Sequence, residues 1–175
     1  MKQRSGNLHP FKNKIFTCED LCLCTGMQMK KRFSLESNTG MENFMERNLN
    51  WAVLGTGVIA NEMAQALNTM GKKLYAVGNR THEKAVKFAE KYQVKKVYDD
   101  FHEMFTDPQV DVIYITTPHN THIEFVREAL KNKKHVLCEK SITLNSLELD
   151  EALQLAKENN VIFAEAMTIW HMPLY

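Results

Sequence analysis

A short glycine-rich motif is the clearest chemical signal in the sequence. It reads Gly55-Thr56-Gly57-Val58-Ile59-Ala60 and follows the spacing G-x-G-x-x-G/A of dinucleotide-binding turns. Gly55 allows a tight turn, Gly57 lacks the Cβ that would block a diphosphate, and Ala60 lets a helix pack closely on a strand. The first N–H groups of such a helix, with its dipole, favour anions. We therefore predict that residues 55–59 bind the diphosphate of a dinucleotide cofactor.

The choice of nucleotide depends on a second segment. About 20 residues after the motif, an NAD site usually has an acid that accepts hydrogen bonds from the ribose 2′-hydroxyl. The sequence has Gly78-Asn79-Arg80 there, without a carboxylate, which also argues against a methyl-donor-binding domain. The Arg80 guanidinium suits a 2′-phosphate through charge-assisted contacts, although a solvated loop charge is the alternative. We expect NADP as the cofactor, with NAD as the second choice.

Two polar clusters follow later apolar runs and are further candidate site residues. The first is Thr116-Thr117-Pro118-His119-Asn120-Thr121-His122, whose histidines could contact a ligand, carry a proton or simply cap the next helix. The second is Glu139-Lys140-Ser141, whose lysine could hold a hydroxyl or carbonyl oxygen and help to move its proton. By position alone, Lys140 is equally consistent with an ordinary surface lysine. Ligands of open α/β sheets bind at the carboxyl ends of strands, where both clusters are expected to lie.

Apolar residues beyond residue 50 alternate between strand-like runs and helical periods. The runs predict strands at residues 51–54, 74–77, 97–98, 112–115, 135–138 and 161–164. Helical spacing predicts inward positions such as Ile59 and Met63 in the first helix, and Ala152 and Leu153 in the last. Repeated βα units impose a parallel sheet with helices on both faces. We therefore predict an α/β, doubly wound, Rossmann-type fold with six mostly parallel strands in three layers.

The segment before residue 49 lacks this regularity. It shows no sustained period of 2 or 3.6, and its internal methionines Met41 and Met45 are alternative starts of translation. We expect a disordered extension at residues 1–48, a nucleotide-binding domain at 49–165, and the start of a crossover to a second domain at 166–175.

The composition excludes several classes of protein. The 175 residues include 22 basic and 21 acidic side chains, so a net charge of +1 provides no field suited to nucleic acid or an anionic membrane. No apolar run approaches the roughly 20 residues of a membrane-spanning helix, and no targeting pattern is evident. Cys18, Cys22 and Cys24 lack a fourth nearby ligand, so reduced thiols are favoured over a metal site. We expect a soluble, cytoplasmic protein.

Beyond residue 50, the sequence resembles the nucleotide-binding half of the glucose–fructose oxidoreductase, inositol dehydrogenase and rhizopine-catabolism (Gfo/Idh/MocA) family. The matching stretches are AVLGTGVIA at 52–60, TTPHNTH at 116–122, CEK at 138–140 and EAMTIWHMP at 165–173. The last of these is similar to the dihydrodiol and sugar dehydrogenases of that family. The resemblance extends from residue 50 to residue 175.

The resemblance implies a role for several of these residues. Lys140 would contact both the nicotinamide and the substrate, and Asn79 and Arg80 would lie at the adenosine ribose. The remaining expected contacts with the cofactor are Thr117, Pro118, His119, His122 and Glu139. Two departures stand out: Ser141 replaces the family's proline, and the chain stops at Tyr175, whereas the family continues into a second domain with the substrate pocket and the oligomer surface.

The resemblance implies an NAD(P)-dependent dehydrogenase that acts on CH–OH groups. Hydride would pass to or from a hydroxyl or carbonyl carbon of a sugar- or diol-like substrate, and this chain would be the cofactor-binding half. We expect it to bind NADPH with little turnover by itself, and to form homo-oligomers only with the second domain. Two alternatives stay open: a non-catalytic nucleotide-binding sensor or regulator, and an inactive truncated product. Lys140 favours the enzyme over the sensor, whereas the missing half favours the inactive product.

Overall fold

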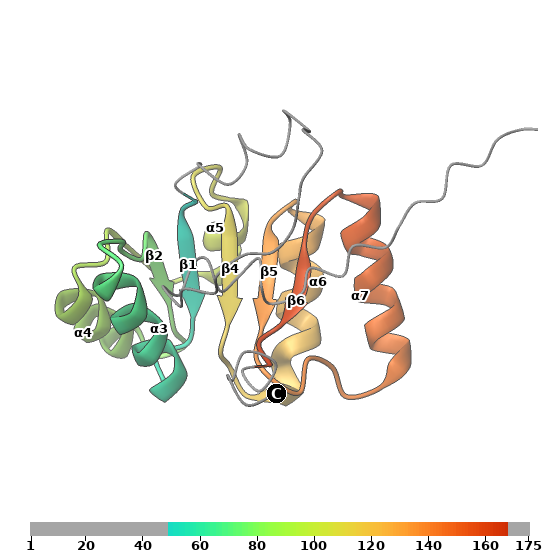
Figure 1. Cartoon of the computed structure of the whole chain (residues 1–175), viewed down its shortest axis with the longest axis horizontal. Helices are drawn as coiled ribbons and strands as arrows, with labels where there is room; N and C mark the ends of the chain where they lie inside the picture. The colour runs from blue at the N-terminus through green and yellow to red at the C-terminus, as the bar shows by residue number, and fades with distance from the viewer. Residues whose placement is uncertain (1–48, 168–175) are drawn as a thin grey trace, which may run out of the picture.

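The described part of the chain, residues 49–167 of a computed structural model, is built on a six-stranded sheet (Figure 1). Its strands are β1 (Trp51–Leu54), β2 (Ala76–Gly78), β3 (Lys96–Tyr98), β4 (Val112–Ile115), β5 (His135–Cys138) and β6 (Phe163–Glu165). The strand order is β3-β2-β1-β4-β5-β6, and all neighbours are parallel. The doubly wound α/β prediction is therefore confirmed. The expected extension at 1–48, its cysteine cluster and most of the expected crossover lie outside the described residues.

Helices cover both faces of this sheet. On one face lie α3 (Val58–Thr69) and α4 (His82–Tyr92), and on the other lie α5 (Phe101–Thr106), α6 (His122–Lys131) and α7 (Ser146–Glu158). A 3₁₀ turn, η1 (His119–Thr121), precedes α6. Successive side chains of a strand point to opposite faces, so β1 contributes to two cores. Val53 packs with the helices α3 and α4, whereas Ala52 and Leu54 pack with α5 and α6.

The strand order creates a switch point between β1 and β4. From β1 the chain proceeds to β2 and β3 on one side, and from β4 it proceeds to β5 and β6 on the other. The loops that leave β1 and β4 therefore diverge toward opposite faces of the sheet. Such a divergence opens a crevice outside the carboxyl ends of the strands.

The inward faces of α3 and α7 agree with the prediction at Ala152 and differ from it at Ile59 and Leu153. In α3 the buried side chains are Ala60, Ala64 and Leu67, while Ile59 is 38% exposed. In α7 Ala152 and Ala156 are buried, while Leu153 is 49% exposed. Both helices pack through alanines, whose small side chains let a helix lie close to its neighbours. The sequence pattern instead gave weight to the larger apolar residues.

Two strands also begin later than predicted. β2 starts at Ala76 instead of Leu74 and includes Gly78, which pairs with Leu54 and Tyr98. β6 starts at Phe163 instead of Val161. Gly78 reads as a strand terminator in the sequence. Its lack of a side chain suits the tight packing there, because a Cβ would lie 2.8 Å from Cε of Met104 and 3.2 Å from the Phe101 ring.

A buried polar cluster holds the amino ends of the strands together. The Asp107 carboxylate accepts hydrogen bonds from the Tyr98 phenol, from Lys96 Nζ at 3.0 Å and from the Gln109 amide at 2.8 Å. Lys134, also buried, donates to the backbone carbonyl of Asp107 at 2.5 Å. Burial by itself would raise the pKa of Asp107, but these hydrogen bonds outweigh it and hold the pKa well below its ordinary value.

We predict that Asp107→Asn lowers the free energy of unfolding at pH 7 by about 2–3 kcal/mol, because it removes charge-assisted hydrogen bonds from a buried site. A depressed folded-state pKa stabilises the fold above the unfolded-state pKa, and this stabilisation is lost as the pH falls toward the folded-state value. The difference between the two proteins should therefore shrink below about pH 4. Urea unfolding followed by circular dichroism measures this. Asp150→Asn, at an exposed position of α7, is the control, and an equal loss in both variants would contradict the prediction.

Candidate functional site

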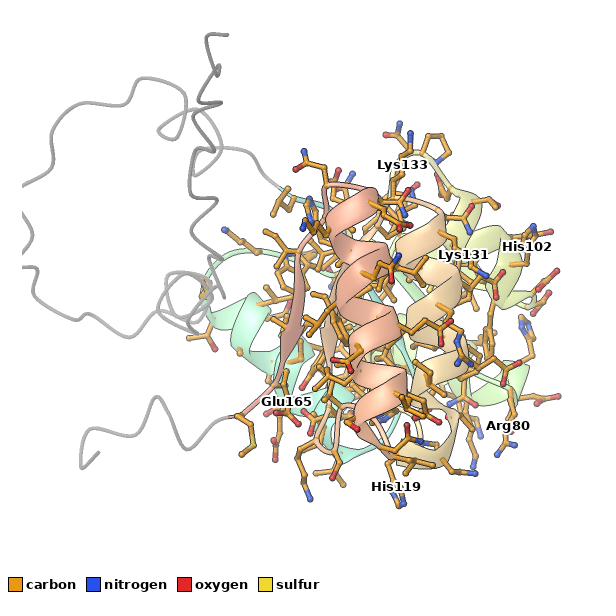
Figure 2. All side chains as sticks on the ribbon, turned by 90° about the vertical axis from the view of Figure 1, so that its right-hand side faces the viewer. Arg80, His102, His119, Lys131, Lys133 and Glu165 are labelled. Atoms are coloured by element: carbon orange, nitrogen blue, oxygen red, sulfur yellow. The ribbon has the colours of Figure 1, made fainter. Side chains whose placement is uncertain are left out.

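A cavity of about 670 Å³ lies at the carboxyl ends of β1, β2 and β4, where the strand order switches. Its size falls in the usual range of small-molecule sites, about 300–1,000 Å³. Figure 2 shows Arg80 and His119 at this end of the molecule, and Lys133 at the opposite end. The lining residues are Gly55, Thr56, Gly57, Asn61, Asn79, Arg80, Thr81, Lys84, Lys87, Phe88, Lys91, Phe101, Thr116, Thr117, Pro118, Thr121 and Phe125.

The glycine-rich turn forms one wall of this cavity and leads into α3. Gly57 is the N-cap residue of α3, and no described atom lies within 4 Å of a Cβ built on it. No side chain caps the helix, and its first turn contains no acid. Within the described residues, the N–H groups of residues 57–60 have no hydrogen-bond acceptor. The turn therefore offers unpaired amides, a positive dipole end and open space to an anion.

The ends of β1 and β4 are locked together beside this turn. The Leu54 carbonyl accepts hydrogen bonds from Thr116 N at 2.9 Å and from Thr116 Oγ1 at 3.0 Å. Gly55 has φ +110°, a region that side chains rarely adopt, and its N–H donates to the Gly78 carbonyl at 2.8 Å. A Cβ on Gly55 would lie 2.6 Å from Thr116 Oγ1. Conformation and close approach thus both require glycine at position 55.

The end of β2 contributes polar and positively charged groups. Asn79 Nδ2 donates to Thr56 Oγ1 at 2.7 Å, and Asn79 Oδ1 accepts from the Thr81 amide at 2.9 Å. Arg80 is exposed at the cavity, and three lysines of α4 line the same wall. Among the described residues that line the cavity, none carries a carboxylate. The site is therefore electropositive and suited to phosphate groups.

The residues after β5 are not among those that line this cavity. Lys140 is exposed, and its peptide bond to Ser141 is cis. The Glu139 carboxylate accepts a hydrogen bond from the phenol of Tyr114 in β4. Burial, and then the hydrogen bond to Glu139, raise the pKa of Tyr114 far above its ordinary value, so the phenol remains a neutral donor. Glu139 is thus held in a fixed position next to Lys140.

His122 does not line the cleft as expected. Its ring is buried, with Nδ1 2.9 Å from the Ser141 carbonyl and Nε2 2.8 Å from the Thr117 carbonyl. A neutral imidazole can donate to only one of these oxygens, whereas a doubly protonated ring can donate to both. The buried His122 ring therefore connects the loop after β4 to the loop after β5 on their inner side. His119, in contrast, is exposed in η1.

The structure brings most of the predicted binding residues to one cavity. Those in its wall are Gly55, Thr56, Gly57, Asn79, Arg80, Thr116, Thr117 and Pro118. Val58 and Ile59 are exposed at the start of α3, just beyond the wall. The prediction missed Asn61, Phe101, Phe125 and the lysines at positions 84, 87 and 91. The lysine spacing of i, i+3 and i+7 after Arg80 marks one helix face and was a usable signal, whereas nothing local marks the two phenylalanines.

Three other observations bear on the chemistry available. Within residues 49–167, no three His, Cys, Asp or Glu side chains gather where they could share a metal ion. None of the helices described there is long and apolar enough to cross a membrane. Cys138 is free but buried, and burial raises the pKa of its thiol, so the sulfur remains protonated and poorly reactive.

Comparison with known sequences identifies close relatives of this domain. The model of the Gfo/Idh/MocA oxidoreductase family, described as an NAD-binding Rossmann fold, matches residues 49–167. A trans-1,2-dihydrobenzene-1,2-diol dehydrogenase from Xenopus laevis is 36% identical over 128 residues, which cover 71% of this chain and 39% of the relative. A myo-inositol 2-dehydrogenase from Thermotoga maritima is 36% identical over 111 residues, covering 63% of this chain and 33% of the relative. The chain thus spans less than half the length of these relatives.

Solved structures agree with this relationship. An NAD-binding oxidoreductase from Klebsiella pneumoniae superposes with a TM-score of 0.66 at 30% identity, covering 71% of this chain and 36% of that one. A 3-ketoreductase from Actinomadura kijaniata, in complex with NADP and TDP-benzene, superposes with a TM-score of 0.68 at 25% identity, covering 73% of this chain and 41% of that one.

The two glycines of the turn should respond differently to substitution. We predict that Gly55→Ala lowers the free energy of unfolding by about 1–3 kcal/mol, because alanine is strained at positive φ and meets Thr116. Gly57→Ala should leave it unchanged or slightly raised, because Gly57 has φ −73° and open space around it. Urea unfolding of both variants tests this. Similar losses of stability in the two variants would show that the space at Gly57 is not open.

Proposed function

This chain belongs to the Gfo/Idh/MocA oxidoreductase family, and we propose that it binds NADP(H) in the cavity at the β1–β4 switch point. The observation that carries the proposal is the junction of the Gly55–Gly57 turn with the uncapped start of α3. Its amides, its open Cβ position and the surrounding cavity fit a diphosphate. Relatives include an NAD-binding oxidoreductase and a 3-ketoreductase solved with NADP, so either nucleotide is compatible with the fold.

The charge of the cavity wall supports NADP over NAD. Asn79 stands where an acid would accept hydrogen bonds from a ribose 2′-hydroxyl, and its amide is already engaged with Thr56 and Thr81. Next to it, Arg80 and Lys84 bring cations to the end of β2. A 2′-phosphate adds about two negative charges and three acceptor oxygens, which these side chains can neutralise.

The exposed face beyond the turn is the proposed place of the nicotinamide and the substrate. The cofactor, when bound, would supply or accept a hydride at C4 of its nicotinamide ring. Val58 and Ile59, exposed apolar residues at the start of α3, would cover an apolar ring surface. Lys140 would hold the oxygen of a hydroxyl or carbonyl group and transfer its proton, while Tyr114 keeps the neighbouring Glu139 in place.

We further propose a dehydrogenase that acts on CH–OH groups of a sugar- or diol-like substrate. Relatives named as a dihydrodiol dehydrogenase and a myo-inositol dehydrogenase support this substrate class. A non-catalytic nucleotide-binding regulator is the second candidate. The exposed Lys140 favours the enzyme, because a purely regulatory nucleotide site would not need an ionisable group beside the nicotinamide position.

Arg80→Ala should weaken NADPH binding by about 10- to 100-fold, because it removes charge-assisted hydrogen bonds to a 2′-phosphate. NADH binding should change little, since NADH lacks that phosphate. Fluorescence titration of the 175-residue chain with both nucleotides measures the two affinities. Arg127→Ala is the matched control, because Arg127 pairs with Glu151 on the outer helices. If the unsubstituted chain binds neither nucleotide, the proposed function is wrong.

Lys140→Ala should leave NADPH affinity nearly unchanged, because Lys140 lies outside the cavity wall. Any NADP-dependent oxidation of diols or inositols should fall by about 100-fold or more, since general acid–base catalysis is lost. Absorbance of the reduced cofactor measures turnover. Lys131→Ala, at the exposed end of α6, is the control, and Figure 2 shows Lys131 away from Arg80 and His119. Unchanged turnover in Lys140→Ala would assign the proton transfer to another group.

A further inference from the structure

Asn61, in the first turn of α3, makes an unusual set of contacts with the glycine-rich turn. Its Nδ2 lies 2.8 Å from the Gly57 carbonyl oxygen and 3.3 Å from the Thr56 carbonyl oxygen. Its Oδ1 accepts hydrogen bonds from the Tyr92 phenol at 2.8 Å and from Lys91 Nζ at 3.0 Å. Because two donors meet Oδ1 and two acceptors meet Nδ2, only one orientation of the amide satisfies all four partners.

These contacts reinforce the direction of two backbone amides. In a planar trans peptide, the carbonyl of one residue and the N–H of the next point in opposite directions. The Gly57 carbonyl accepts the first intrahelical hydrogen bond, from the Asn61 backbone N–H at 3.1 Å, and the Asn61 side chain adds a second bond to it and a bond to the Thr56 carbonyl. The N–H groups of Gly57 and Val58 therefore point away from Asn61. Both N–H groups are without an acceptor among the described residues. The side chain of Asn61 thus orients the donors that an anion would meet.

We propose that Asn61 is a positioning residue that orients the amides of Gly57 and Val58 for the cofactor diphosphate. The inference rests on the proposed nucleotide binding. A preorganised donor does not have to be reordered when the ligand arrives, and this lowers the cost of binding. Asn61 therefore acts through the backbone of the turn, and its effect should be confined to ligands that carry a diphosphate.

The orientation of Asn61 is set in turn by α4. Tyr92 and Lys91 both donate to Asn61 Oδ1, and the Lys91 ammonium lies 4.7 Å from the centre of the Tyr92 ring. Gln65 Nε2 donates to the Tyr92 oxygen at 3.4 Å. The Tyr92 side chain is buried between α3 and α4, so its phenol is a fixed donor. The helix α4, whose lysines line the cavity, thus also stabilises the conformation of the glycine-rich turn.

The residue type at position 61 follows from these contacts. A carboxamide both donates to carbonyls and accepts from a phenol and an ammonium group. Aspartate would keep the acceptor but lose the donors and place a negative charge beside the diphosphate. Alanine would lose both sets of bonds. Asn68 is an exposed asparagine of the same helix, and within residues 49–167 its side chain makes no hydrogen bond, so it provides a matched position for comparison.

The test compares two ligands of the 175-residue chain, NADP⁺ and adenosine 2′-monophosphate, which has the adenine and the 2′-phosphate but no diphosphate. Asn61→Ala should weaken NADP⁺ binding about tenfold, while binding of the monophosphate stays nearly unchanged. Tyr92→Phe should show the same selectivity with a smaller loss, and Asn68→Ala should show none. Binding is followed by NMR titration, and thermal unfolding checks that each variant is folded. Tyr92→Phe provides the comparison if Asn61→Ala does not fold.

Each outcome bears on the inference. NADP⁺ binding that Asn61→Ala leaves unchanged would overturn it, as would an equal loss for both ligands, which is what a purely structural role predicts. If the unsubstituted chain binds the monophosphate but not NADP⁺, the diphosphate does not reach the turn and the inference is overturned. If it binds neither ligand, the proposed function itself fails.

Discussion

The cavity depends on the close approach of β1 and β4 at their carboxyl ends. Thr116 donates twice to the Leu54 carbonyl and leaves no room for a side chain on Gly55. This contact fixes where the two diverging loops begin, and the sheet then directs one to α3 and the other to η1. A crevice at this place follows from the parallel topology. Glycine at position 55 is therefore needed for β1 and β4 to approach this closely. Glycine at position 57 instead leaves open space in front of the first amides of α3.

Distinct elements supply the groups that, in the proposed function, would meet different parts of a dinucleotide. The start of α3 offers amides, α4 offers lysines, and the loop after β5 offers an ionisable side chain. Behind them, His122 and Tyr114 hold the loops after β4 and β5 through buried hydrogen bonds. Such buried contacts keep the exposed groups in position without contacting a ligand. The exposed Lys140 thus extends from a loop that His122 and Tyr114 hold on its inner side.

Much of this arrangement was predictable because its signals are local. The glycine motif and the apolar run at Val112–Ile115 each depend on neighbouring residues, and the structure confirms the strand. Ile59 was predicted to face inward but is partly exposed, because the packing of α3 depends on how close the sheet lies. The burial of His122 depends on two loops that meet only in the folded chain. Phe101 and Phe125 reach the cavity from separate helices, so no sequence window contains both.

The polar cluster around Asp107 lies at the amino ends of the strands, whereas the nucleotide cavity lies at their carboxyl ends. Substitutions distant from each other and without shared partners usually have additive effects. Substitutions around Asp107 can therefore change thermal stability, and substitutions around the cavity can change nucleotide preference, as nearly separate traits. A lineage that adapts to heat or acid need not re-optimise its cofactor chemistry, and an engineer who changes cofactor selectivity has a distant region in which to restore lost robustness.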